Sequence, residues 1–504
     1  MRKILRKRFD GITWYMPEGE EIGFTTLASP LSQKDTTIIK KGRRKVFASL
    51  KGAGGEVYIK VFYLTNLAHR LKHLFFKSKA LKELTIGLTA EDRGISAVVP
   101  VAAGEKKDFG LLKECYLLVK KIEGALDLKD YLLRGDVPQH LRGRVIEALG
   151  SLAKKSHDAG ILQEDFALNN FLLGNPQDST PSLYLIDFER ARLSSKLSER
   201  KRAWTLAKLN RAGGDFSLTD KVRFLRAYLG GTLGKETIHP WMEELERQTL
   251  QILRRDAWRI WKACSRGDRG YKLYEKRPLR AYFLEGYDIG DLLPLAEDLR
   301  PVHLRQIRTF LGHFEVTQAN GKIEKKDREA NVNIYKFAPL HHTIKGMRPA
   351  KGAWQSTNAL LKGNFPVCPA IGALERVEGP SYQGFLITES MPGLEDLHSL
   401  FQQNPSGPGR QKILWHTARF LSRLHNFGTL ALPITSGDIG VLESPGGKMR
   451  LYLACPYNFI MKVPSPEDKE VDLQRLEDFL AGLLGEGERE LFRKQYQRHS
   501  RYLP

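Results

Sequence analysis

Residues 156–192 constrain the fold of this chain more than any other stretch. They place a polar turn between two apolar segments, and the turn carries Asp165 and, five positions later, Asn170. Asp187 then follows a Leu-Tyr-Leu-Ile run, which is typical of a buried strand. We therefore expect three oxygen-bearing side chains to sit at the ends of short strands, where a fold can bring them together.

This spacing is typical of the phosphotransfer site of protein kinases. That chemistry needs a carboxylate to orient the attacking hydroxyl and accept its proton, which suits Asp165. It also needs oxygen ligands for Mg²⁺ beside the nucleotide phosphates, which suits Asn170 and Asp187. Protein kinases carry His-Arg-Asp and Asp-Phe-Gly, whereas this chain has Gln-Glu-Asp and Asp-Phe-Glu. One such residue in a loop is more often part of a turn, but three at this spacing favour catalysis.

A strand predicted at residues 55–62 carries Lys60, which we expect to hold the α- and β-phosphates of a nucleotide. A lone lysine on a strand usually faces solvent, and only its place upstream of Asp165 favours a functional role. Its predicted ion partner is Glu83, with Glu91 as the alternative. The single glycine of residues 42–45 marks a phosphate-covering loop only poorly.

Apolar residues recur at helical spacing through residues 64–83, and cations occupy the other faces. The pattern predicts one basic amphipathic helix. Such a helix either lies on an anionic lipid surface or packs on the sheet with a solvated cationic face. The sequence favours neither interpretation over the other.

Length and composition indicate a soluble protein of two domains, because 504 residues exceed one ordinary core. We place the domains at residues 1–264 and 265–504. No apolar run is long enough for a transmembrane helix, and the N-terminus lacks the features of a signal peptide. These features predict a cytoplasmic protein. The four cysteines show no metal-ligand spacing and are expected to be buried and reduced.

The formal net charge is +22, which attracts polyanions such as nucleic acid, an anionic membrane or a phosphorylated substrate. Charge alone does not choose among them. No nucleic-acid recognition module is visible in the sequence, so nucleic acid is the weakest of the three partners.

The second half of the chain repeats the plan of the first. Residues 384–393 correspond to 115–124, residues 331–337 to the strand of Lys60, and residues 422–428 to 154–160. Asp187 lies 30 residues after His157, and Cys455 lies 30 residues after His425. A match without gaps across both the turn and the strand indicates a tandem repeat.

The catalytic residues are not kept in the second copy. In this register Asp165 falls on Pro433, Asn170 on Asp438 and Asp187 on Cys455, while Glu83 falls near Ala353. Proline accepts no proton, and a thiol is a poor ligand for Mg²⁺. Lys336 is the expected counterpart of Lys60, so nucleotide binding by the second copy stays open while catalysis there is not expected.

The first copy resembles the lipopolysaccharide kinase family, kinase-like enzymes that phosphorylate heptose or 3-deoxy-octulosonic acid (Kdo) sugars of the inner core in Gram-negative bacteria. The resemblance covers residues 36–230 well and 310–484 only as a degenerate copy. It rests on residues 71–83, 93–95, 157–161, 186–192 and 206–211, together with Asp165 and Asn170. Gln163 stands where the family usually has histidine.

The resemblance implies an α+β fold of two tandem protein-kinase-like bilobal domains, each with a β-rich N-lobe and a helical C-lobe. It implies a kinase that uses ATP and Mg²⁺, with Asp165 as catalytic residue, Lys60, Glu83, Asn170 and Asp187 binding the nucleotide, and the last two holding the metal. The acceptor would be a lipopolysaccharide core or lipid A-linked sugar at the anionic inner face of the inner membrane, where the protein would be peripheral.

Two alternatives stay open. One is a kinase for another hydroxyl, of an aminoglycoside, a choline-like alcohol or a protein serine, although the strong basic charge disfavours small cationic acceptors. The other is a non-catalytic glycolipid-binding scaffold made of two degenerate kinase folds, against which the complete set of Asp165, Asn170 and Asp187 argues.

Overall fold

The computed structural model describes residues 2–20, 31, 36–42, 45–52, 55–134, 136–176, 181–211, 216–231, 234–297, 299, 301–309, 312–325, 328–339, 348–379, 381–431, 439–443, 449–453, 459–461, 464–480 and 483–500. The chain divides into two compact units, Met1–Thr249 and Leu250–Pro504. The division falls inside the helix α8 (Lys235–Ala263), and the predicted boundary at residue 264 directly follows that helix.

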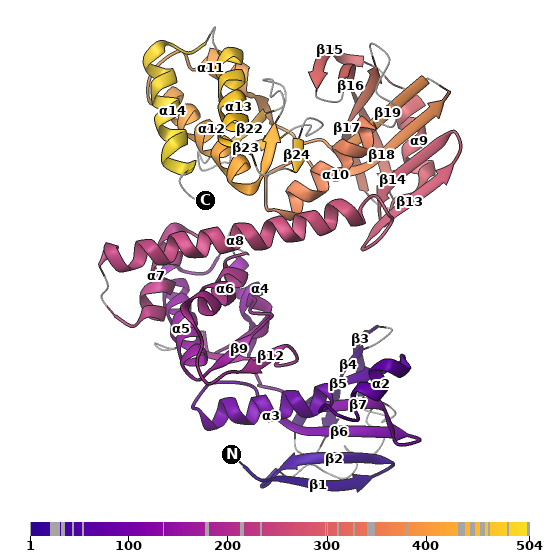
Figure 1. The fold of residues 1–504 in the computed structure, drawn as a ribbon, viewed down its shortest axis with the longest axis vertical. Helices are drawn as coiled ribbons and strands as arrows, with labels where there is room; N and C mark the ends of the chain where they lie inside the picture. The colour runs from indigo at the N-terminus through magenta and orange to yellow at the C-terminus, as the bar shows by residue number, and fades with distance from the viewer. Residues whose placement is uncertain are drawn as a thin grey trace. The chain divides into compact units, whose positions relative to one another are not determined.

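The first unit begins with a seven-stranded antiparallel sheet in the order β1-β2-β6-β7-β5-β4-β3 (Figure 1). Its strands are β1 (Ile4–Phe9), β2 (Ile12–Pro17), β3 (Thr36–Lys41), β4 (Lys45–Gly52), β5 (Gly55–Tyr63), β6 (Pro100–Asp108) and β7 (Leu111–Lys120). Two helices, α2 (Leu67–Lys72) and α3 (Lys79–Asp92), connect β5 to β6.

The two faces of this sheet have different partners. Ala80 and Leu84 of α3 pack with Phe62 of β5 and Leu117 of β7 in one buried cluster. Val57, Ile59 and Val61 of β5 belong to a separate cluster on the opposite face. Because side chains alternate along a strand, Lys60 lies on the same face as Phe62, toward α3.

A helical part with two small sheets follows in the first unit. Its helices are α4 (Leu128–Leu133), α5 (Gln139–Asp158), η1 (Leu168–Asn170, a 3₁₀ turn), α6 (Glu199–Asn210), α7 (Leu218–Leu229) and the first part of α8. One small sheet has the order β11-β10-β8, with β8 (Leu126–Asp127), β10 (Phe171–Gly174) and β11 (Ser182–Leu185). The other pairs β9 (Ile161–Gln163) with β12 (Ala191–Leu193).

The single helix predicted at residues 64–83 is wrong, because the chain breaks it into α2 and α3. The backbone N–H of His73 bonds back to the carbonyl of Arg70, which closes α2 with a tight turn. Ser78 then starts α3, since its side chain accepts a hydrogen bond from the backbone N–H of Leu81. The helical spacing of apolar residues continues across the break between α2 and α3, and in the sequence only the capping serine, Ser78, marks that break.

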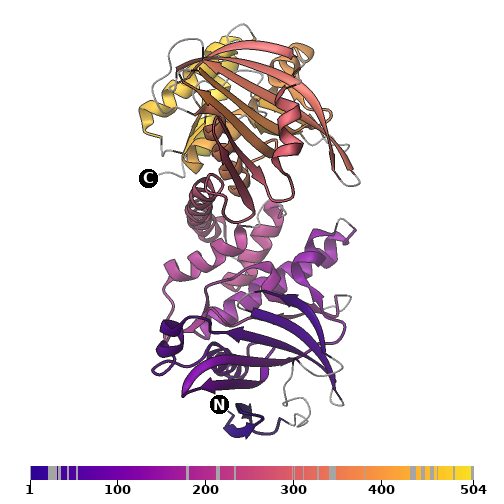
Figure 2. The same cartoon turned by 90° about the vertical axis from the view of Figure 1, so that its right-hand side faces the viewer.

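The second unit has the same strand order in its large sheet, β13-β14-β18-β19-β17-β16-β15. These strands and the two helices among them are β13 (Tyr271–Lys276), β14 (Leu279–Leu284), α9 (Ile289–Glu297), β15 (Pro301–Thr309), β16 (Gly312–Lys325), β17 (Arg328–Pro339), α10 (Pro349–Lys362), β18 (Ala370–Glu378) and β19 (Ser381–Glu389). Figure 2 shows this sheet and that of the first unit from a second direction.

The remaining elements of the second unit are mostly helical. They are β20 (Glu395–Asp396), α11 (Leu397–Gln403), α12 (Pro408–Phe427), β21 (Thr429–Ala431), β22 (Ile439–Glu443), β23 (Met449–Leu453), β24 (Phe459–Met461), α13 (Pro466–Phe479) and α14 (Glu486–Ser500). The two small sheets, β20-β22-β23 and β21-β24, correspond to the three-stranded and two-stranded sheets of the first unit. Each unit is thus an antiparallel sheet followed by helices, which confirms the α+β class.

A buried histidine–tyrosine pair also recurs in both units. The Nδ1 atom of His157 lies 2.9 Å from the hydroxyl of Tyr228, and the Nδ1 atom of His425 lies 2.6 Å from that of Tyr496. The separation along the chain is 71 residues in both cases. The two units therefore share a long-range contact between helices.

The expected match of Lys336 with Lys60 is wrong by one residue. Lys60 pairs across the sheet with Leu117, whose counterpart by the repeat is Leu386, and Leu386 pairs with Tyr335. Tyr335 packs in a cluster with residues of α10, the helix that corresponds to α3. Lys336, next along the strand, therefore belongs to the opposite face.

Two further predictions concern cysteines and membrane spans. Cys115, Cys264 and Cys368 are buried and free, as expected, and Cys455 lies outside the described residues. Within the described part of the chain, no helix combines the length and apolar character needed to cross a bilayer.

Candidate active site

Lys60 stands at the centre of a buried ion-pair network in the first unit. Its Nζ atom lies 2.8 Å from a carboxylate oxygen of Glu83 on α3 and 3.4 Å from one of Asp187. Glu83 is almost fully buried and Asp187 is one-third exposed, so the network leads from the core toward solvent. The alternative partner Glu91 instead pairs with Arg2 at 3.0 Å. Three residues far apart in the sequence therefore meet at one point.

The charge of Lys60 is stabilised by this arrangement. Burial opposes the charged form, but the carboxylates of Glu83 and Asp187 outweigh it and raise the pKa of Lys60 above its ordinary value. The side chain is therefore a fixed cation within reach of solvent, which suits a phosphate ligand. Removing either carboxylate would leave a buried charge with less compensation.

Asp187 adopts a backbone conformation that is unusual for a residue other than glycine, with φ of +61°. Gln163 holds it there, because its Nε2 atom donates to the carbonyl oxygens of Ile186 at 3.0 Å and Asp187 at 2.9 Å. Gln163 is buried on β9. The residue that departs from the family's usual histidine thus positions Asp187 with its amide, a role that the sequence did not reveal.

Asn170 joins the two polar turns. Its Nδ2 atom donates to the backbone oxygen of Asp165, and its own backbone oxygen accepts from the N–H of Ile186 at 3.0 Å. Asn170 is buried, whereas Asp165 is exposed in the turn after β9. The structure therefore links Asp165, Asn170 and the residue before Asp187 through adjacent hydrogen bonds, and Asp165 stays exposed to solvent.

Glu189, two residues after Asp187, forms a second cluster that the sequence analysis missed. Its carboxylate lies 3.1 Å from the Nζ atom of Lys45 and 2.7 Å from that of Lys79. Burial alone would raise the pKa of Glu189, but the two lysines outweigh it and lower the pKa to about 2. Glu189 thus fastens the segment after Asp187 to β4 and to the first residue of α3. The signal was the acidic residue standing where protein kinases have glycine.

The corresponding positions in the second unit do not form such a network. Ala353, on α10, is buried where Glu83 would be, and Tyr335 stands in the register of Lys60. Pro433, Asp438 and Cys455 lie outside the described residues. At the two positions that the structure describes, neither side chain carries a charge.

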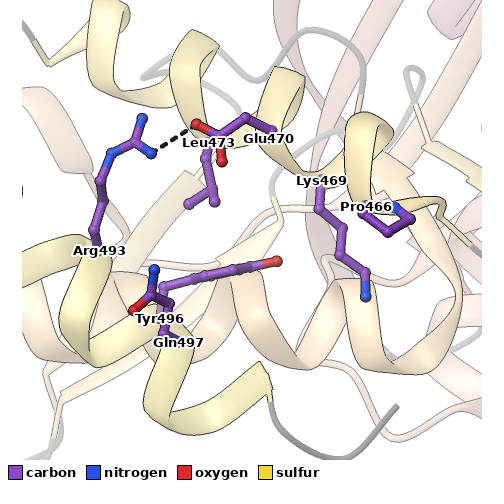
Figure 3. Close-up of a pocket in the computed structure, with 7 residues that line it drawn as sticks. All are labelled: Pro466, Lys469, Glu470, Leu473, Arg493, Tyr496 and Gln497. Atoms are coloured by element: carbon purple, nitrogen blue, oxygen red, sulfur yellow. Dashed lines mark hydrogen bonds and ion pairs between the residues drawn. The ribbon is translucent and has the colours of Figure 1, made fainter. Parts of the chain in front are cut away.

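A small pocket lies in the second unit, between α13 and α14 (Figure 3). Its volume is about 200 Å³, and its wall includes the ion pair of Arg493 with Glu470 at 2.6 Å. Pockets for small ligands usually reach about 300 Å³ or more. It contains none of the predicted site residues, and we assign it no function.

The sequence profile of the lipopolysaccharide kinase (Kdo/WaaP) family matches residues 32–228 and 339–430, which is more than half of the chain. The chain belongs to this family. Lipopolysaccharide kinases are phosphotransferases, and the kinase class implies ATP as the phosphoryl donor. The match includes all five predicted site residues of the first unit and extends into the second.

Two curated members of the lipopolysaccharide kinases are similar to parts of the chain. The 3-deoxy-D-manno-octulosonic acid kinase of Photobacterium profundum is 30% identical over 140 residues, which cover 28% of this chain and 53% of that protein. The lipopolysaccharide core heptose(I) kinase WaaP of Escherichia coli is 25% identical over 225 residues, covering 38% of this chain and 84% of that protein. The chain therefore spans about half the length of the first relative and most of the second.

A solved structure described as WaaP in complex with acyl carrier protein is also similar, at 20% sequence identity and a TM-score of 0.35. The alignment covers 47% of this chain and 98% of that one.

Proposed function

We propose that the first unit is an ATP-dependent kinase that phosphorylates a heptose or Kdo hydroxyl of the lipopolysaccharide inner core. The observation that carries the proposal is the network of Lys60 with Glu83 and Asp187, joined to Asn170 and the exposed Asp165. Kinase chemistry consists largely of positioning and charge stabilisation, and this network supplies both.

In this proposal each residue has one task. Lys60, held by Glu83, binds the α- and β-phosphates of ATP. Asp165 orients the sugar hydroxyl and accepts its proton as the oxygen attacks the γ-phosphorus and the bond to the β-phosphate oxygen breaks. Acid–base catalysis of this kind contributes about 10²- to 10⁴-fold in rate.

Asn170 and Asp187 are the residues that would hold Mg²⁺. An amide oxygen and a carboxylate are hard ligands of the type that Mg²⁺ takes alongside phosphate oxygens. The ion, when bound, neutralises negative charge on the phosphates. Gln163 contributes by fixing the backbone of Asp187, and the Nζ atom of Lys60 lies 3.4 Å from its carboxylate.

We also propose that each unit is a bilobal kinase-like domain and that the second is a pseudokinase. Support comes from the shared strand order and the repeated histidine–tyrosine pair, together with the uncharged Tyr335 and Ala353. Because the second unit has no counterpart of the Lys60–Glu83 pair at these positions, it lacks the fixed cation that would bind phosphates there. The second unit is then available for binding substrate, membrane or the first unit.

The proposed acceptor is anchored in a membrane and carries carboxylates and phosphates. The charge of +22 suits such a partner, and the proposed location is the cytoplasmic face of the inner membrane. The names of the two relatives support both a Kdo and a heptose acceptor, and the sequence identity to each is too low to choose between them.

The test is phosphate transfer by the full chain to acceptors that end in Kdo or extend to heptose, with products weighed by mass spectrometry. We expect one acceptor to gain a single phosphate and Asp165→Asn to reduce the rate by about 10²-fold or more. Asp158→Asn, a matched change at a half-exposed aspartate paired with Lys154 and Arg202, should keep the wild-type rate. Normal turnover by Asp165→Asn, or transfer to neither acceptor, would refute the proposal.

A further inference from the structure

An exposed apolar surface lies beside α2 in the first unit. Helix α2 buries none of its residues, and the chain from its start to α3 exposes five large apolar side chains. The turn between β6 and β7 adds Phe109, which is 99% exposed. We call this surface the apolar ledge; it consists of Leu67, Leu71, Leu74, Phe75, Phe76 and Phe109. Scattered single apolar residues are normal on a surface, but a cluster of this kind indicates an interaction site.

The ledge is held in place by backbone contacts. The Nε and Nη2 atoms of Arg70 donate to the carbonyl oxygens of Leu112 and Asp108, each at 3.2 Å, which fixes α2 to the β6–β7 hairpin. The ring Nδ1 atom of His73 lies 3.3 Å from the carbonyl oxygen of Phe76 and ties down the segment after α2. Phe75 and Phe76 are therefore presented outward by a defined structure.

Cations surround the ledge. Residues 64–82 contain no aspartate or glutamate but include exposed Lys72 and Lys77. Lys72 lies over the ring of Phe76, with Nζ 5.7 Å from the ring centroid. On the adjoining hairpin, Lys107 and Lys113 are also exposed. Aromatic rings among cations are the signature of a segment that enters the boundary of an anionic bilayer.

We propose that the apolar ledge docks the protein on a membrane of anionic phospholipid. The rings of Phe75 and Phe109 stand out from the surface, at 86% and 99% exposure, and exposed lysines lie beside them. A fluid bilayer accepts such projecting rings without a preformed groove, and its phosphates meet the lysines. The occupant that matches both features is therefore an anionic lipid surface.

The ledge is also close to the candidate active site along the chain. Two residues after Lys77, Lys79 binds Glu189 and so fastens the segment that carries Asp187. Docking would therefore bring the site to the membrane that holds the acceptor. This last step rests on the proposed function, whereas docking itself does not.

The test is co-sedimentation of the full chain with vesicles of phosphatidylcholine, with and without phosphatidylglycerol. We expect binding only to the anionic vesicles, and at least about tenfold weaker binding for Phe75→Ser/Phe76→Ser. The matched control is Leu193→Ser/Leu218→Ser, which removes two apolar side chains exposed elsewhere in the same unit and should bind as wild type. Lys72→Gln/Lys77→Gln should weaken binding to anionic vesicles and reduce its dependence on salt.

Equal binding by the phenylalanine variant and the control, or no binding of the wild-type chain to anionic vesicles, would overturn the proposal. Capture of an acidic soluble protein through the ledge, without vesicle binding, would replace the membrane by a protein partner. Phosphate transfer to a water-soluble core oligosaccharide separates this test from the proposed function. The phenylalanine variant should keep that activity and lose transfer to acceptor embedded in vesicles.

Discussion

Glu189 is the residue whose contribution to the site was least visible in the sequence. The prediction is that Glu189→Gln slows phosphate transfer about tenfold, equivalent to ~1.4 kcal/mol. The amide keeps the size of the side chain but loses the charge that binds Lys45 and Lys79, so α3 and the segment after Asp187 separate more easily. Glu244→Gln, which breaks a local pair with Arg247, is the matched control and should leave transfer unchanged. Equal rates for the two variants would contradict the role of Glu189.

His157 makes the stability of the first unit depend on pH. Burial lowers its pKa from 6.5 to about 4, so between these values the unfolded chain binds a proton that the folded chain excludes. Stability therefore falls as the pH drops from 6.5 to 4, by at most about 3.4 kcal/mol for this residue.

Urea unfolding of the full chain at several pH values, following the transition of the first unit, measures this dependence. His157→Gln should be less stable at neutral pH, because it loses the contact with Tyr228, and should show a smaller loss of stability on acidification. The same pH slope in wild type and variant would assign the effect to other groups.

At the level of elements, α3 carries Glu83 and its serine cap therefore affects the site. We predict that Ser78→Ala destabilises the first unit by about 1 kcal/mol and weakens ATP binding, because α3 frays at the end that Lys79 holds. Ser217→Ala removes the equivalent cap from α7, which carries no predicted site residue. It should cost similar stability with unchanged ATP affinity. A matching loss of affinity in both variants would show that stability alone explains it.

The elements also show what sequence patterns can and cannot predict. Strand positions were predictable because period 2 is a local pattern, and Glu83 was named as the partner of Lys60, which it contacts at 2.8 Å. The break between α2 and α3 was not, since the apolar spacing continues across it. The face of Lys336 was missed because a shift of one residue in register exchanges the two faces of a strand. Gln163 and Glu189 act through long-range contacts with backbone and lysines, which no local pattern records.

At the scale of the whole molecule, two units of one topology differ in their central residues. The first keeps a charged network around Lys60, and the second has Tyr335 and Ala353 at the matching positions. The second unit keeps a packed core without such a network, because the cluster that includes residues of α10 consists of apolar side chains. If only the first unit holds a cation for phosphates, the chain binds one ATP.

The most direct test of this account is the stoichiometry of ATP binding to the full chain in the presence of Mg²⁺, measured by isothermal titration calorimetry. We predict one nucleotide per chain, lost in Asp187→Ala and in Lys60→Ala, and unchanged in Lys336→Ala, because Lys336 lies on the opposite face of its sheet. Two nucleotides per chain, or full binding by Asp187→Ala, would contradict the account.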